Sequence, residues 1–339
     1  MKPPISRLRL ETLLFLTVWL WGCAAPPPAA EHAAPTTGEV IGRNDDFVVV
    51  VAQPGDTLAS LAVNYLGDAQ LAWRIAEFND VTEARPGVEL AIPLKWPNAI
   101  GVYAQGYQTV PILCYHRFST HRAKLAVTPA AFAAQMDYLA TNHYRVISLT
   151  ELQGFLQGRE ALPRRTVVIT IDDGYRSTFD AAFPILKKHG FHATVFLYSD
   201  FVGAADALTW PQMQEMQQSG LIDIQPHSKT HANLVLRQPQ ENEAQYRERI
   251  RKEVDVPSDV IAARLATKTT LFAYPYGDTN EVVIDELKHR GLALGATVTP
   301  GGNGFFADPY MLRRTMVFGE DDITAFASKL VVFNKSSDY

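Results

Sequence analysis

Two adjacent carboxylates and two spaced histidines have the residue types and positions that metal-assisted hydrolysis needs. Asp172 and Asp173 follow the β-branched run 166–171, which is typical of a buried parallel strand. His227 and His231 lie four positions apart, after a second strand-like segment. Two imidazoles and one carboxylate leave coordination positions open on a catalytic metal, and a second carboxylate beside them can act as a general base.

Other interpretations of these residues stay open at this point. Either aspartate could cap the helix that follows the strand, and two histidines with one carboxylate also suit Fe(II) in oxygen chemistry. A thermolysin-like protease is disfavoured, because His227 and His231 enclose no glutamate to serve as its base. Six further histidines are interpreted as surface or core residues: His32, His121, His143, His189, His192 and His289.

Size and composition fit an ordinary globular protein. The chain has 339 residues, of which 47% are hydrophobic and 20% charged, enough for one large domain and one small one. The net charge is -5 and no long basic run is present, which argues against nucleic acid as a partner. The cysteines, Cys23 and Cys114, do not indicate a structural disulfide, because Cys23 falls in a targeting region.

Residues 1–23 have the pattern of an export signal. Basic residues precede the apolar run 13–21, which is too short for an ordinary transmembrane helix. The run ends at Leu20-Trp21-Gly22-Cys23, which resembles a bacterial lipobox. We therefore predict a lipid anchor to the membrane at Cys23, on the periplasmic face of the outer membrane because Ala24 rather than an acidic residue follows. A plain cleaved signal, giving a cell-envelope or secreted protein, and an uncleaved anchor are the alternatives.

A tether and a small folded unit follow the signal. Residues 24–45 are rich in alanine and proline, which predicts an extended linker without a core. Residues 46–94 predict a strand at 47–51, two helices that begin near Thr57 and Ala72, and a closing strand at 89–92.

The small unit resembles a LysM domain. The residues that carry the resemblance are Gly55, Asp56, Thr57, Leu58, Ala62, Trp73, Ile75, Asn79, Pro86, Gly87, Ile92 and Pro93. The resemblance implies a βααβ fold that binds N-acetylglucosamine-containing glycans, chiefly peptidoglycan or chitin, and favours the loop Gly55-Asp56-Thr57 as the binding segment. An appendage that only packs against the rest of the chain is the alternative.

A connector at 95–109 leads to a large domain at 110–335, in which strands and helices alternate. The first strand and its exit loop are predicted at 110–118, and further strands at 144–149, 166–171, 192–198, 221–227, 270–275, 292–298 and 313–317. Helices are predicted to open at Thr128-Pro129 and to span 150–157, 178–189, 210–219, 241–252, 257–266, 279–290 and 321–331. The repeated βα units predict an α/β fold, a distorted (β/α) barrel preceded by the small βααβ domain.

The candidate site residues follow different strands of the predicted barrel. Asp172 and Asp173 follow one strand, His227 a second, Pro275-Tyr276 a third, and His116 the first strand of the domain. Because the carboxyl ends of barrel strands meet at one face, these side chains are expected to converge there. Scattered core residues would not all fall at strand ends.

The large domain resembles the NodB-type polysaccharide deacetylases, carbohydrate esterase family four. Three segments carry the resemblance: Thr170-Ile171-Asp172-Asp173-Gly174, His227-Ser228-Lys229-Thr230-His231, and, in part, Phe272-Ala273-Tyr274-Pro275-Tyr276-Gly277. The resemblance implies that Asp172 is the general base and that Asp173, His227 and His231 hold a divalent metal. Zn2+ is expected, with Ni2+, Co2+ or Fe2+ as alternatives. It also implies that the backbone N–H of Tyr276 stabilises the tetrahedral oxyanion.

The chain departs from the family pattern where two catalytic groups are usually found. Ala273 stands where an arginine usually steadies the base, and no histidine follows His289 to supply the late general acid. A similar arrangement, with permuted motifs, is typical of exported poly-N-acetylglucosamine deacetylases. By that resemblance Tyr115-His116 supplies the acid, and we hypothesise that Arg314 replaces the missing arginine.

These observations predict removal of N-acetyl groups from N-acetylhexosamine units of a cell-envelope polysaccharide. The LysM resemblance favours peptidoglycan as substrate, whereas the permuted motifs favour poly-N-acetylglucosamine. An O-acetyl esterase acting on xylan and a catalytically inactive wall-binding protein are the alternatives. Tyr175 and Trp210 are assigned either to a sugar groove or to packing.

Overall fold

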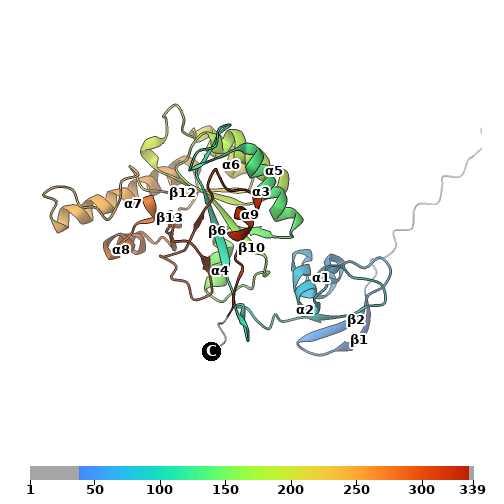
Figure 1. Ribbon diagram of the computed structural model, residues 1–339. Helices are drawn as coiled ribbons and strands as arrows, with labels where there is room; N and C mark the ends of the chain where they lie inside the picture. Colours follow the sequence, from blue (N-terminus) through green and yellow to red (C-terminus); the bar gives the residue numbers. More distant parts are fainter. Residues whose placement is uncertain (1–37, 336–339) are drawn as a thin grey trace, which may run out of the picture.

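The structure is a computed structural model, which describes residues 38–335 (Figure 1). The predicted signal segment 1–23, with the anchor site Cys23, lies outside the described residues, as does most of the predicted linker. Within residues 38–335, no helix has both the length and the apolar character that crossing a membrane requires.

The N-terminal unit is a three-stranded antiparallel sheet covered by two helices. Its strands are β1 Glu39–Arg43, β2 Phe47–Val51 and β3 Glu89–Pro93, and its two α-helices are α1 Leu58–Leu66 and α2 Ala72–Asn79, with the short 3-10 turn η1 Ala69–Leu71 between them. Alternate residues of β2 and β3 point inward, so Val48, Val50, Leu90 and Ile92 share a core with Leu61 and Ile75. The unit therefore has a hydrophobic core of its own.

The predicted linker differs from the structure at its end, because residues 39–43 form strand β1. This strand pairs with β2 and has a bulge between Val40 and Gly42. Almost all of β1 is exposed, so it lacks the alternation of apolar and polar residues that would have revealed it. The pairing partner, rather than the composition of residues 39–43, determines this strand.

The large domain is built around parallel strands with buried faces. In sheet order these are β12 Ile222–Pro226, β11 Ala193–Leu197, β10 Thr166–Ile171, β6 Val110–Tyr115 and β16 Thr315–Met316, with β9 Arg145–Ile147 beside β10. The edge strand β15 Gly302–Asn303 pairs antiparallel to the start of β6. β6 and β10 are buried along their whole length, as expected of strands covered on both sides.

The ring of strands is completed by a separate parallel pair, β13 Leu271–Ala273 and β14 Leu294–Ala296. No ladder joins β12 to β13 within the described residues; instead, the side chain of Gln225 accepts hydrogen bonds from the N–H groups of Thr270 and Leu271. A single bridge joins Ala296 to Leu312, shortly before β16. The structure is thus a distorted, interrupted barrel, in agreement with the predicted fold class.

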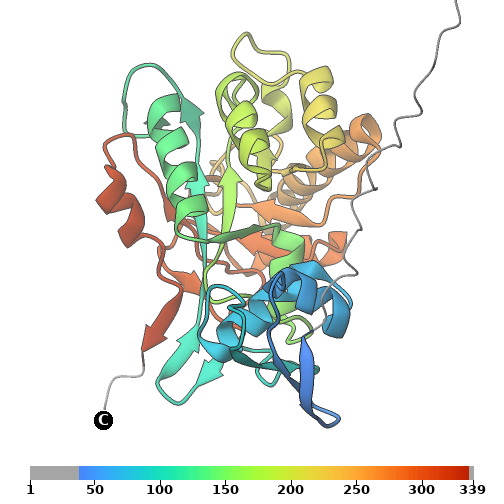
Figure 2. The ribbon, with the colours of Figure 1, turned by 90° about the vertical axis from the view of Figure 1, so that its right-hand side faces the viewer.

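Helices surround the barrel, and short elements complete it (Figures 1 and 2). The helices are α3 Pro129–Thr141, α4 Leu149–Leu156, α5 Phe183–His189, α6 Trp210–Gln218, α7 Glu243–Leu265, α8 Glu281–Arg290 and α9 Ile323–Ser328. The short elements are β4 Val102–Tyr103, β5 Gly106–Gln108, β7 Arg117–Phe118, β8 Ala126–Val127, β17 Phe333–Lys335, η2 Thr178–Ala182, η3 Ser199–Phe201 and η4 Pro275–Gly277.

The prediction of two helices at 241–252 and 257–266 is wrong, because α7 continues through Pro257. A proline inside a helix removes one backbone hydrogen bond and usually ends or kinks it. Here Tyr246, Ile250 and Ile261, on both sides of Pro257, are buried against the domain. Tertiary packing thus outweighs the local cost of the proline.

The N-terminal unit contacts the barrel at the end where β10 begins. Glu77 of α2 accepts a hydrogen bond from the backbone N–H of Arg164, at 2.7 Å, two residues before β10 starts. Asp172 follows the other end of the same strand, roughly 20 Å away for six extended residues. Figure 2 shows the blue N-terminal unit beside the lower end of the barrel. The small unit and the candidate site are therefore at opposite ends of the strands.

Candidate metal centre and active site

The candidate site lies at the carboxyl ends of the barrel strands, in the loops that follow β6, β10, β12 and β13, which we call the mouth. Four of its non-glycine residues have left-handed backbone conformations: Asp173 with φ 74°, Ser228 with φ 70°, His231 with φ 61° and Tyr276 with φ 63°. Such conformations cost about 1 kcal/mol or more per residue. These residues all fall in the three motif segments, which indicates that the backbone there is shaped by the site.

Asp173, His227 and His231 come together as one donor set. Their ligand atoms all lie within 4.8 Å of one another. Oδ1 of Asp173 is 3.2 Å from Nε2 of His231 and 3.7 Å from Nε2 of His227. The same Oδ1 is buried and has no hydrogen-bond partner among the described residues. An unpaired buried carboxylate oxygen facing two imidazoles fits a divalent cation.

The surroundings of His227 prepare it to be a ligand. Its Nδ1 lies 2.8 Å from the carbonyl oxygen of Ala273, which fixes the proton on Nδ1 and leaves the lone pair on Nε2. Burial lowers the pKa of His227, and the nearby carboxylates oppose this shift without cancelling it. Ala273 stands where the family arginine is expected, so this position contributes through its backbone.

Asp172 is held by Arg314 in a fully buried ion pair. Nη1 of Arg314 donates to Oδ1 of Asp172 at 2.6 Å, and Nη2 donates to Oδ2 at 2.8 Å. Burial alone would raise the pKa of Asp172, but the Arg314 guanidinium and the neighbouring imidazoles hold it well below the usual range. The structure thus places Arg314 against the carboxylate, as the sequence hypothesis requires.

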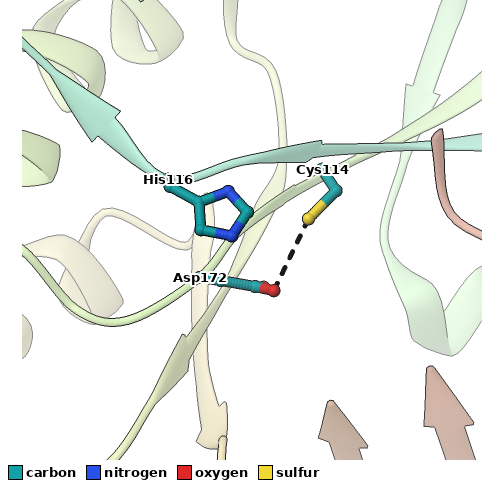
Figure 3. A group of neighbouring side chains, drawn as sticks. All are labelled: Cys114, His116 and Asp172. Atoms are coloured by element: carbon teal, nitrogen blue, oxygen red, sulfur yellow. Dashed lines mark hydrogen bonds between the residues drawn. The ribbon is translucent and has the colours of Figure 1, made fainter. Parts of the chain in front are cut away.

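A second group of side chains, Cys114, His116 and Asp172, lies beside the first (Figure 3). The thiol of Cys114 is 3.5 Å from Oδ2 of Asp172, and Nδ1 of His116 is buried without a hydrogen-bond partner among the described residues. Burial raises the pKa of the Cys114 thiol well above its ordinary value, and the guanidinium of Arg314 already neutralises Asp172. These charges favour an acid–base group rather than a second metal site.

Cys114 was not identified as a site residue from the sequence. It lies on β6, two residues before His116, which directly follows the strand, and the ligand atoms of both lie close to Asp172. Once His116 is assigned to the site, Cys114 could have been predicted as its neighbour, because residues two positions apart in an extended segment point to the same side.

The third motif forms the rim of the mouth. Tyr276, in η4, has φ 63°, and its side chain is 60% exposed with its ring centroid 5.0 Å from that of His231. This geometry places Tyr276 next to the candidate metal set. The role of its backbone N–H stays a prediction.

The two aromatic residues assigned to a groove or to packing separate in the structure. Tyr175 lines a pocket of about 170 Å³ together with His116 and Asp173, and the guanidinium of Arg117 lies over its ring at 4.1 Å. Trp210 instead packs against the main hydrophobic core. A larger cavity of about 410 Å³, lined by Tyr107 and Phe306 among others, contains none of the motif residues.

Comparison with known proteins identifies the family. The polysaccharide deacetylase family model matches residues 159–295. The protein YxkH of Bacillus subtilis (strain 168), whose name assigns it to the polysaccharide deacetylases, is 32% identical over 208 residues, which is 61% of this chain and 71% of YxkH. The chain belongs to the polysaccharide deacetylase family.

Further relatives of this polysaccharide deacetylase carry more specific names. A poly-β-1,6-N-acetyl-D-glucosamine N-deacetylase of Staphylococcus epidermidis is 28% identical over 203 residues, 57% of this chain and 68% of the relative. The chain spans only 37% of an Escherichia coli (strain K12) protein of the same name, at 24% identity over 63% of this chain. The solved structure of IcaB from Ammonifex degensii is 27% identical, with a TM-score of 0.59, and the match covers 67% of this chain and 97% of IcaB.

Proposed function

We propose that the chain hydrolyses the N-acetyl groups of N-acetylhexosamine units in a cell-envelope polysaccharide. The observation that carries this proposal is the arrangement of the mouth. A three-residue metal set, Asp173, His227 and His231, adjoins a carboxylate that is oriented by a buried arginine. The names of the relatives, which include poly-β-1,6-N-acetyl-D-glucosamine N-deacetylases, support an amide rather than another linkage.

Asp173, His227 and His231 would hold the metal, for which we propose Zn2+, with Ni2+, Co2+ or Fe2+ as alternatives. When bound, such an ion supplies Lewis acidity for the amide carbonyl and lowers the pKa of water at the site. Asp172 takes the proton from the attacking water, because its carboxylate adjoins this set, with Oδ2 3.9 Å from Nε2 of His227. Arg314 keeps that carboxylate in one orientation through two hydrogen bonds.

The remaining steps need an oxyanion donor and an acid. The backbone N–H of Tyr276 stabilises the negative charge that develops on the acetyl oxygen. His116, whose buried Nδ1 has no hydrogen-bond partner among the described residues, donates a proton to the departing nitrogen. Water adds to the carbonyl carbon, the carbon–nitrogen bond breaks, and acetate and a free amine on the sugar result.

The N-terminal unit would bind the glycan and hold the catalytic domain near it. From β2 to β3 it has the strand–helix–helix–strand order that the LysM resemblance implies, and Oδ1 of Asp56 in the predicted binding loop is buried without a hydrogen-bond partner among the described residues. Tethering a catalytic domain to its polymer raises the effective substrate concentration, in favourable cases by orders of magnitude. We propose peptidoglycan or poly-N-acetylglucosamine as the polymer, with Cys23 anchoring an exported protein to the outer membrane.

A panel of acetylated polymers tests the proposal directly. Acetate release is measured from peptidoglycan, poly-N-acetylglucosamine, chitin oligomers and acetylxylan, each with and without a chelator. Chelator-sensitive release from the N-acetylated glycans is expected. Release from acetylxylan alone would overturn the proposal in favour of an O-acetyl esterase. An absence of release from every polymer by metal-loaded protein would favour a wall-binding protein without catalytic activity.

A further inference from the structure

The loop between His227 and His231 is fastened by a carboxylate from a distant helix. Glu253, in α7, is 5% exposed. Its Oε2 accepts hydrogen bonds from the backbone N–H of Lys229 at 3.0 Å and of Thr230 at 2.9 Å. Its Oε1 accepts a third from the Thr230 hydroxyl, at 2.8 Å. One buried side chain therefore receives three donors from two consecutive loop residues.

This loop requires such a fastening because its backbone is strained. Ser228 and His231 have positive φ, and the segment 228–231 contains no glycine to ease that conformation. The other side of the loop is held by η3, where the N–H of Asp200 donates to the carbonyl of Lys229 at 3.0 Å. Glu253 supplies the contacts on the side of α7. The loop residues that it holds lie between His227 and His231 in the sequence, so it can influence the positions of both ligands.

We propose that Glu253 is a positioning residue that sets the affinity of the metal centre. Its three loop hydrogen bonds are to Lys229 and Thr230 rather than to the histidines, and it acts by fixing the loop so that Nε2 of His227 and Nε2 of His231 stay within reach of Asp173. Residues that orient metal ligands in this indirect way typically change metal affinity by about 10- to 100-fold when they are replaced. The proposal rests on the metal set of the proposed function but not on the polymer or on the reaction.

Zn2+ binding to the metal-free protein tests this role without any reaction. Affinity is measured by competition with a chelating dye, and Co2+ absorption reports the geometry of the ligands. Glu253→Gln keeps the shape of the side chain but replaces one acceptor with an NH2 group, and we expect about 10- to 100-fold weaker Zn2+ binding. Thr230→Val removes only the hydroxyl contact, so a smaller loss is expected. Glu248→Gln, an exposed position on the same helix, is the matched control and should bind as wild type.

Thermal unfolding of the metal-free variants separates positioning from simple stability. A positioning role predicts weaker binding by folded protein, with Glu253→Gln losing affinity more than Thr230→Val and with excess metal restoring much of the lost occupancy. Wild-type Zn2+ affinity in folded Glu253→Gln would overturn the proposal, even if its stability is lower. Glu253→Ala should lose still more affinity; if it does not fold, the Gln variant decides. Should the wild type bind Zn2+ but release no acetate, the proposed function fails and the role of Glu253 stands.

Discussion

The N-terminal unit and the mouth of the barrel use the polar residues of their motifs in opposite ways. In the small unit, the side chain of Asn79 makes three hydrogen bonds to backbone groups of Ile75 and Ala91, and Thr57 caps α1. In the mouth, Asp173, His227 and His231 face one another, and Oδ1 of Asp173 lacks a hydrogen-bond partner among the described residues. Asn79 and Thr57 thus hold the fold of the small unit together, whereas Asp173, His227 and His231 are grouped as ligands would be.

This difference explains why the deacetylase resemblance supports a function more strongly than the LysM resemblance does. The LysM-like residues account for the architecture of the small unit, and Oδ1 of Asp56, in its predicted binding loop, is buried without a hydrogen-bond partner among the described residues. The deacetylase-like residues account for a donor set that the fold itself does not need. Function can thus be argued in detail for the mouth, while for the small unit it depends on binding experiments.

Removal of the metal should have the largest effect on activity, and it should affect only the mouth and not the N-terminal unit. Chelation is expected to abolish acetate release, and added Zn2+ or Co2+ should restore it, because the ligand atoms of Asp173, His227 and His231 are grouped as a metal site would need. Glycan binding by the N-terminal unit should not change, since none of the three residues of the metal set belongs to that unit. Acetate release that persists after complete chelation would contradict the metal assignment.

Asp172→Asn should lower acetate release by about 10²- to 10⁴-fold, the usual contribution of a general base. Asparagine keeps the shape but cannot accept the proton from water. Steady-state kinetics on N-acetylglucosamine oligomers measure the loss, and the metal content of the purified variant serves as the control. A variant with full metal and wild-type turnover would remove Asp172 from the mechanism.

His116→Ala is expected to reduce turnover by up to the same factor, with metal content unchanged, because it lies next to Asp172 but outside the donor set. Substrates with better leaving groups than a sugar amine should be affected less, since they need less help from an acid. Equal losses on both kinds of substrate would argue that His116 only supports the structure of the site.

Arg314→Ala should destabilise the protein by about 3–5 kcal/mol at neutral pH, since it leaves the buried Asp172 charge without its partner. In the wild type the pKa of Asp172 is lowered on folding, so the pair stabilises the fold above the ordinary carboxyl pKa and less as the pH falls below it. The stability difference between variant and wild type should therefore shrink in acid.

The same substitution should change the pH dependence of the reaction. Without the guanidinium, burial is the main influence on Asp172 and raises its pKa. The acid limb of the kcat/KM profile should therefore move to higher pH in Arg314→Ala, and less so in Arg314→Lys, which keeps a positive charge. An unmoved acid limb in the alanine variant would mean that Arg314 does not act on the base.

The sequence predicted the mouth better than the parts that support it. The convergence of Asp172, Asp173, His227 and His231 could be predicted because strand ends and the four-residue spacing are local patterns, while their roles stay predictions. Arg314 could only be a hypothesis, because it is 142 positions from Asp172 and only the folded barrel brings β16 beside β6. Glu253 gave no signal at all, since a glutamate in a charged helix is ordinarily exposed and only the structure shows it buried beneath the loop.

The smallest effect on the chemical step is expected from removal of the N-terminal unit. A variant that begins at Lys95 loses the contact between Glu77 and Arg164, which lies at the end of β10 opposite Asp172. Because the unit has its own core, its loss should leave kcat on soluble oligomers unchanged while it raises the amount of insoluble polymer needed for half-maximal rate. Residues 38–94 expressed alone provide the matched control and should bind the polymer. Equal losses on oligomer and polymer would show that the small unit shapes the mouth across the length of the barrel, and the separation of the two regions would then be wrong.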